Sequence, residues 1–221
     1  LIYVVVDDAG SLWNTMTLAL PDGHQHVAFK GQDRVVVLRE TSASAELRLY
    51  DLTASPEIVP VGEPVSLYGE ELFGLEVTTS VAYIATSDGL ERVDVAGQNP
   101  AYRDALLIEG GVTGIALNEQ QVYLTSPQGG VHVVGISDPD ELLSLGLFPL
   151  ASQAGLHGVS HSDGHAYVLA DDGVHIITLG CEELCDDGTD NDLDGFADCD
   201  DLDCLDAEDC VAPIHTTCQS V

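Results

Sequence analysis

The stretch "TGIALNEQQVYLTS", from Thr113 to Ser126, carries the pattern that decides the fold. A glycine in second place precedes an aliphatic run, a polar turn follows, and a tyrosine stands inside a second aliphatic run. The same pattern recurs without a gap in "FGLEVTTSVAYIAT" (Phe73 to Thr86) and in "HGVSHSDGHAYVLA" (His157 to Ala170). Three copies of one motif predict a repeated structural unit.

The spacing of the copies indicates the class of fold. The aligned tyrosines Tyr83, Tyr123 and Tyr167 are 40 and 44 residues apart, since 123 − 83 = 40 and 167 − 123 = 44. Weaker copies occur in "HVAFKGQDRVVVLRE" and "LIYVVVDDAGSLW". Short apolar runs between frequent turn signals predict an all-β protein, and a unit of about 40–45 residues with four strands is typical of a β-propeller blade. The sequence therefore predicts β-propeller-like repeats of about 40–44 residues, with four to five blades visible over residues 1–180.

The first and the last repeat are incomplete in this pattern. No strand precedes Tyr3, and no outer strand follows Leu179. Two interpretations remain open: the N-terminal strand completes the last blade and closes the ring, or the chain is part of a larger ring.

Two further stretches resemble a known family. "GGVHVVGISDPDELLSLG" (Gly129 to Gly146) and "HAYVLADDGVHII" are similar to the LVIVD repeat of bacterial and archaeal surface proteins. The resemblance covers residues 1–180 and implies a propeller-like domain. It implies no catalytic activity.

The composition limits the partners. Lys and Arg together number 6 against 38 Asp and Glu, which gives a formal net charge of -32, and no Lys or Arg follows Arg103. Nucleic acids and anionic membrane surfaces need a basic binding surface, so neither is an expected partner. No apolar run approaches 18 residues, so no membrane span is expected.

The cysteines lie together at the end of the chain and predict a disulfide framework. An even set in so acidic a segment indicates an oxidising compartment, hence a secreted or cell-surface protein. Six cysteines allow 15 pairings, which the spacing does not resolve. No C-x-x-C pair is present, which argues against zinc. The six are Cys181, Cys185, Cys199, Cys204, Cys210 and Cys218.

The segment "CDDGTDNDLDGFADCDDLDC", from Cys185 to Cys204, predicts a calcium site. Its acidic residues stand at the spacing of a twelve-residue calcium loop, in which alternating carboxylates and one backbone carbonyl surround the ion and a glycine permits the sharp turn. Counted from Asp190 as position 1, the glycine is Gly195. The predicted ligands are Asp190, Asp192, Asp194, Phe196 (through its carbonyl), Asp198 and Asp201, with Asp186 and Asp187 as outer-shell candidates.

This segment also resembles known modules. It is similar to the calcium loops of dockerins and thrombospondin type 3 repeats, and it matches a cysteine-bracketed metal-binding motif of bacterial secreted and surface proteins through Cys204. Position 12 is Asp rather than Glu, and no amphipathic helices flank the loop, which argues against a calcium sensor. The resemblance implies a calcium-binding module over residues 181–221 in which the ion is structural.

Histidines offer an alternative metal site. His157, His161 and His165 fall on one face if the strands around Ser162-Asp163-Gly164 form a hairpin, because residues i and i+4 of a strand share a face. Three imidazoles could hold zinc or copper. His24 and His26 form a second pair compatible with a metal. Exposed histidines without a metal are the competing interpretation of both sets.

The sequence favours a non-catalytic protein. It contains no G-x-S-x-G motif and no glycine-rich phosphate loop, and its cysteines all lie in the acidic tail. We expect a secreted or surface binding or structural protein whose partners are calcium and another protein or a surface glycan. The alternatives are a transition-metal protein or metalloenzyme using the three histidines, and a subunit of a homo-oligomer or extracellular filament assembled by strand addition.

Overall fold

All the elements that the structure describes are β-strands. The computed structural model describes residues 2–6, 12–17, 24–31, 33–41, 44–53, 58–118, 120–127, 130–139, 141–150, 155–162 and 165–178. Among these residues there is no helix, and therefore none with the length and hydrophobicity to cross a membrane. The prediction of an all-β protein is confirmed.

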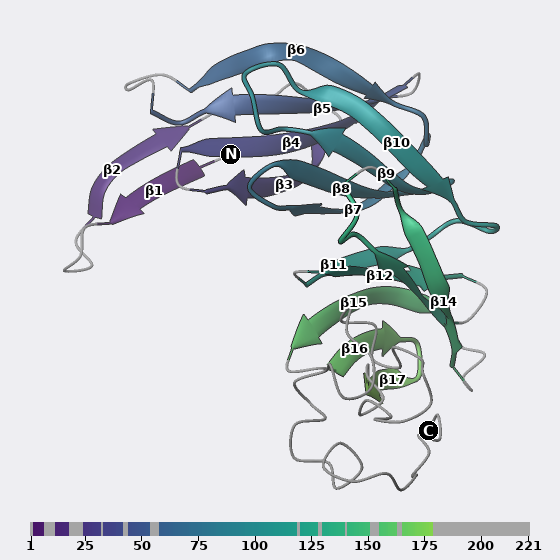
Figure 1. Cartoon of the computed structure of the whole chain (residues 1–221). Helices are drawn as coiled ribbons and strands as arrows, with labels where there is room; N and C mark the ends of the chain where they lie inside the picture. Colours follow the sequence, from purple (N-terminus) through teal and green to yellow (C-terminus); the bar gives the residue numbers. More distant parts are fainter. Residues whose placement is uncertain are drawn as a thin grey trace, which may run out of the picture. The chain divides into compact units, whose positions relative to one another are not determined.

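Seventeen strands follow one another along the described residues (Figure 1). They are β1 (Ile2–Val6), β2 (Leu12–Thr17), β3 (His24–Lys30), β4 (Arg34–Thr41), β5 (Ser44–Asp51), β6 (Val59–Leu67), β7 (Leu72–Val77), β8 (Val81–Thr86), β9 (Gly89–Asp94), β10 (Ala101–Leu107), β11 (Gly114–Leu117), β12 (Gln121–Ser126), β13 (Gly130–Gly135), β14 (Leu143–Pro149), β15 (Leu156–Ser162), β16 (His165–Ala170) and β17 (Gly173–Thr178).

The strands form five small sheets, and within each sheet the strands are neighbours in chain order. Three sheets have four strands, namely β3–β6, β7–β10 and β11–β14. The described residues add a two-stranded sheet, β1–β2, and a three-stranded sheet, β15–β17. Each four-stranded sheet is an antiparallel meander. The repeated segments of the sequence form the first two strands of the sheets.

Consecutive sheets pack face to face through apolar side chains. We call the face that a sheet turns to the sheet before it in the chain its preceding face, and the other its following face. In the β7–β10 sheet, Ala82 and Ile84 of β8 lie on the preceding face, in a core shared with Val36 and Leu38 of the β3–β6 sheet. Tyr83 and the other β8 residues of the following face contribute to a second core shared with the β11–β14 sheet. All six residues of β8 are therefore buried.

The second-place glycine of the repeat marks where first strands of consecutive sheets meet. β3 contacts β7, and β7 contacts β11. A Cβ at Gly74 would lie 2.5 Å from Cγ2 of Ile115, and a Cβ at Gly114 would lie 2.7 Å from Cα of Gly158. A larger residue has no room at either place. The glycine in the motif is thus required by the approach of the next sheet.

A second repeated glycine begins the third strand of a sheet. Gly89 has φ +139°, and a Cβ there would lie 2.3 Å from the carbonyl oxygen of Leu106 on β10. Only glycine meets both conditions without strain. At this position the glycine of the Gly-aliphatic step is therefore required both by the turn and by the fourth strand.

The chain divides into two compact units. One comprises Leu1–Ser160 and Val168–Val174, and the other comprises His161–Tyr167 and His175–Val221. The predicted boundary between residues 180 and 181 lies outside the described residues, as do all six cysteines. The disulfide framework and the domain boundary stay predictions.

Candidate functional site

The predicted calcium ligands, Asp190 to Asp201, lie outside the residues that the structure describes. The chemistry of this donor set suits a hard divalent cation, because carboxylate and carbonyl oxygens are the ligands that Ca²⁺ prefers. The calcium loop stays a prediction from the sequence.

His157, on β15, is paired with a carboxylate. Its Nε2 lies 2.6 Å from Oδ1 of Asp171, in the turn between β16 and β17, and both side chains are exposed. The backbone N–H of Gly155 donates to Oδ2 of Asp171 at 3.2 Å. The hydrogen bond from His157, followed by the one from Gly155, lowers the pKa of Asp171. The pair joins the beginning of β15 to the turn after β16.

His161 is the second-last residue of β15, and His165 is the first residue of β16. The ring of His165 is 6.3 Å from that of Tyr167. Within the described ranges, no three His, Cys, Asp or Glu side chains are grouped so that they could hold a metal. The three-histidine metal site therefore gains no support from these residues and stays a prediction.

His26, of the H-x-H pair, has a structural contact. Its Nε2 lies 3.2 Å from the carbonyl oxygen of Leu72, so this side chain joins β3 to the first strand of the next sheet. Glu40 of β4 reaches the same residue, accepting from the N–H of Leu72 at 3.2 Å.

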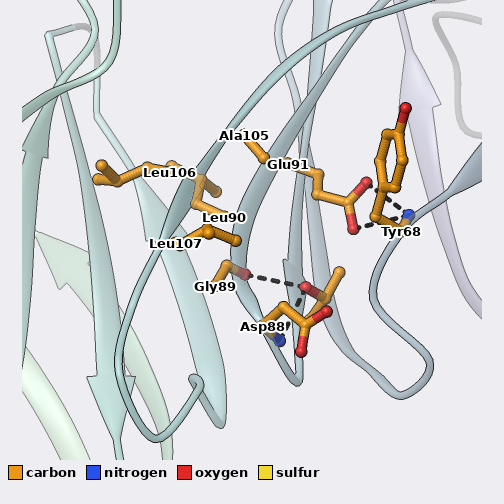
Figure 2. Close-up of a pocket in the computed structure, with 9 residues that line it drawn as sticks. Tyr68, Asp88, Gly89, Leu90, Glu91, Ala105, Leu106 and Leu107 are labelled. Atoms are coloured by element: carbon orange, nitrogen blue, oxygen red, sulfur yellow. Dashed lines mark hydrogen bonds between the residues drawn. The ribbon is translucent and has the colours of Figure 1, made fainter.

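Two adjacent charged residues on β9, Glu91 and Arg92, are buried, with exposed fractions of 2% and 1%. Sequence reasoning missed both. The Glu91 carboxylate accepts from the backbone N–H of Tyr68 at 3.0 Å (Figure 2). It also accepts from the backbone N–H of Gly69 at 2.7 Å. It therefore holds the connection between β6 and β7. The available signal was the charged pair inside the apolar run "GLERVDV".

Arg92 points to the opposite face of β9 and is held by Asp104 of β10. Its Nε donates to Oδ1 of Asp104 at 2.6 Å, and its Nη2 donates to Oδ2. Nη1 also reaches the carbonyl oxygen of Asp138, in the connection between β13 and β14, at 3.5 Å. The bidentate contact with Asp104 raises the pKa of Arg92. The guanidinium thus joins two strands of its own sheet to the next sheet.

A small hollow lies beside Glu91, between the β6–β7 connection and the β9–β10 hairpin (Figure 2). The space that the centre of a water molecule can reach in it is about 10 Å³. That is room for about one water molecule, so this hollow does not take an organic ligand. Its lining includes Tyr68, Thr86, Asp88, Leu106 and Leu107.

Two tyrosines, one buried and one partly buried, make the stability sensitive to alkaline pH. Burial raises the pKa of Tyr123 to about 12, and burial followed by the charge of Glu91 raises that of Tyr102 to about 12. The Tyr123 hydroxyl donates to Oε1 of Gln121 at 2.6 Å and accepts from Nδ2 of Asn118 at 2.9 Å.

We expect the free energy of unfolding to fall between about pH 10 and pH 12. The unfolded chain releases phenolic protons at about pH 10, whereas the folded chain retains them, so the tyrosine contribution is complete below pH 10 and is lost as the pH rises. Tyr123→Phe is expected to remove roughly 2 kcal/mol of this pH-dependent loss. Urea unfolding at several alkaline pH values measures it, and an unchanged slope in the Phe variant would contradict the assignment.

These features define an all-β protein of serially repeated antiparallel sheets whose buried charges are used to connect strands and sheets. No known protein family and no curated protein matches the chain. Solved structures do resemble it. The computationally designed Ika4 protein has a TM-score of 0.57 at 15% identity, covering 75% of this chain and 97% of Ika4.

Two other similar structures come from longer chains. The computationally designed Ika8 protein has a TM-score of 0.54 at 15% identity, covering 69% of this chain and 44% of Ika8. A candidate 6-phosphogluconolactonase from Bacteroides uniformis has a TM-score of 0.62 at 12% identity, covering 76% of this chain and 59% of its own. The chain thus spans less than two thirds of these two. Identities this low show a shared fold alone.

Proposed function

We propose that the protein is a non-catalytic binding or structural protein of the cell exterior. A β-propeller-type array of sheets forms its body, and a calcium-stabilised, disulfide-linked module forms its tail. The observation that carries the proposal is the calcium-loop spacing from Asp190 to Asp201 between bracketing cysteines. Calcium loops and disulfides together are typical of extracellular modules.

The arrangement of strands supports the propeller part of the proposal. In a propeller the first strand of each blade lies nearest the axis, so first strands of consecutive blades are neighbours. Here β3 contacts β7, β7 contacts β11, and Gly114 of β11 approaches Gly158 of β15. The fourth strands β6 and β10 also contact each other.

The use of the buried charges supports a scaffold rather than a reaction centre. A catalytic carboxylate or cation needs access to a substrate, whereas Glu91 holds two backbone amides and Arg92 holds Asp104. Rigid propeller bodies commonly present loops to proteins or glycans, and these are the partner classes that we propose.

Calcium binding is expected at a dissociation constant of about 0.1–1 mM, typical of extracellular modules, and about 1 kcal/mol of stabilisation at millimolar calcium. Calorimetric titration of the disulfide-intact chain, together with thermal melts with and without chelator, measures both. Asp190→Asn and Asp194→Asn should abolish the heat of binding. Glu141→Gln, an exposed carboxylate distant in sequence, is the control and should bind calcium as the unmodified chain does. Absence of binding heat at millimolar calcium would sink the calcium part of the proposal.

A further inference from the structure

Tyr167, on β16, is more exposed than its counterparts in the two preceding sheets. Tyr83 and Tyr123 occupy the same place in the repeat and lie on the following faces of their sheets, where they are 4% and 1% exposed. Tyr167 is 37% exposed. It therefore lacks, among the described residues, the cover that buries the other two.

Ile176, on the neighbouring strand β17, shows the same difference. Its counterparts, each the third residue after the glycine that begins its strand, are Arg92 and Val133, which are 1% and 4% exposed, whereas Ile176 is 63% exposed. Leu169 and Val174 share the following face, because residues i and i+2 of a strand point the same way, and they are 52% and 63% exposed. The described part of the chain thus leaves an apolar face of β16 and β17 uncovered.

The segment that follows this sheet in the chain, residues 179–221, is poor in apolar surface of its own. Its carboxylates outnumber its large apolar residues, and it contains no Lys or Arg. Segments of about 40 residues bury too little apolar surface to fold without disulfides, a metal or a neighbouring surface. Its large apolar residues therefore gain most from an apolar surface close by; they include Leu184, Leu193, Phe196, Leu202, Leu205, Val211 and Ile214.

We propose that residues 179–221 pack on Tyr167 and Ile176 of the same chain and cap the following face of the β15–β17 sheet at β16 and β17. The segment leaves directly from β17, which ends at Thr178, two residues after Ile176. Tyr167, Ile176 and the segment also belong to one compact unit. A short covalent connection gives an effective concentration of the order of millimolar, so the contact forms without the loss of freedom that association of two molecules costs. A second copy would also bring a formal charge of -32 against a chain of equal charge.

The cap gives the acidic tail a role besides holding an ion. Repeat proteins need a terminal unit that covers the last apolar surface and presents a polar outer face, since an uncovered end associates with other molecules. The segment has both properties, because its apolar residues can cover the sheet while its carboxylates stay hydrated and repel other copies. The inference rests on the apolar residues of the two surfaces and is independent of the calcium proposal.

Photo-cross-linking tests the contact in the full, disulfide-intact chain. Tyr167→p-benzoylphenylalanine and Ile176→p-benzoylphenylalanine should each form adducts with peptides of residues 179–221, which mass spectrometry identifies after reduction and digestion. Leu107→p-benzoylphenylalanine is the control, because Leu107 is 78% exposed on β10, and it should give no such adducts. Mixing each variant with isotopically labelled unmodified chain separates adducts within one chain from adducts between copies.

Adducts confined to residues 1–178 overturn the proposal, because another part of the chain then covers the face. Adducts with the labelled copy overturn it in favour of self-association, and the absence of adducts from both positions overturns it in favour of an open face. Tail adducts that are equally frequent from residue 107 also overturn it, because the tail then contacts the sheets without preference.

Limited proteolysis gives a second measurement. Ile176→Asp should raise the rate at which a protease that cleaves beside acidic residues cuts within residues 179–221 by at least about tenfold, because a charge in the contact opposes docking. Leu107→Asp should leave this rate unchanged. Equal rates in Ile176→Asp and in the unmodified chain refute the docking. Loss of calcium binding with unchanged adducts would refute only the proposed calcium function.

Discussion

Asp104→Ala is expected to lower the free energy of unfolding by about 3 kcal/mol, which is the low end of the cost of breaking a buried ion pair. The Arg92 guanidinium is 1% exposed and donates from Nε and Nη2 to the Asp104 carboxylate. Removing the carboxylate leaves this cation buried without its main partner. The cost stays at the low end because Asp104 itself is 33% exposed, so water can reach the vacated place.

Urea denaturation at neutral pH measures this loss. Asp94→Ala is the matched control, since Asp94 lies on the same sheet and accepts an exposed contact from the N–H of Ala96 at 2.8 Å. It should cost less than about 1 kcal/mol. The double variant Arg92→Met with Asp104→Ala should be more stable than Asp104→Ala alone, because it removes the unpaired charge. Equal losses in Asp104→Ala and Asp94→Ala would show that the buried pair does not stabilise the fold.

Gly114→Val and Gly158→Val are expected to differ although both glycines hold the second place of the repeat. The Cβ at residue 114 would lie 2.7 Å from Cα of Gly158 and 2.9 Å from Oγ1 of Thr125. The first of these is backbone and cannot rotate away, so the sheets must separate, at a cost of about 1–3 kcal/mol or more. At residue 158 a Cβ meets nothing of the described residues within 4 Å, and the expected change is within about 0.5 kcal/mol.

Thermal and urea unfolding of the two variants make the comparison. Similar destabilisation of both would mean that residue 158 is covered within a single chain.

Much of the fold could be predicted from the sequence, because local patterns carried it. The apolar runs around Tyr83, Tyr123 and Tyr167 predicted strands, their spacing predicted a repeated sheet, and both are confirmed. The sequence pattern showed that Gly74 and Gly114 belong to the motif. It did not show why glycine is required there, because the atoms that these residues approach lie 41 and 44 residues further along the chain. The propeller closure and the calcium loop stay proposals.

The buried charges could not be predicted for a related reason. In the sequence, Glu91 and Arg92 are two adjacent charges within a strand, and nothing along the chain shows that either is buried. Whether a charged side chain is buried depends on what packs against both faces of its strand, and here those surfaces come from the β6–β7 connection and from Asp104 and Asp138. The cost of burying such groups is offset only when those partners are in place.

By itself, the sequence determined the class of this protein, its repeat, its acidic charge and the calcium-loop pattern of its tail, because each depends on residue type and on spacing along the chain. Only the tertiary structure decided which of three equivalent glycines is covered, which charges are buried, and that Leu169 and Val174 are exposed. The physical reason is that a side chain is buried only when a surface from a distant segment packs against it. Equivalent residues therefore differ in exposure when one sheet has a neighbouring sheet and another has none among the described residues.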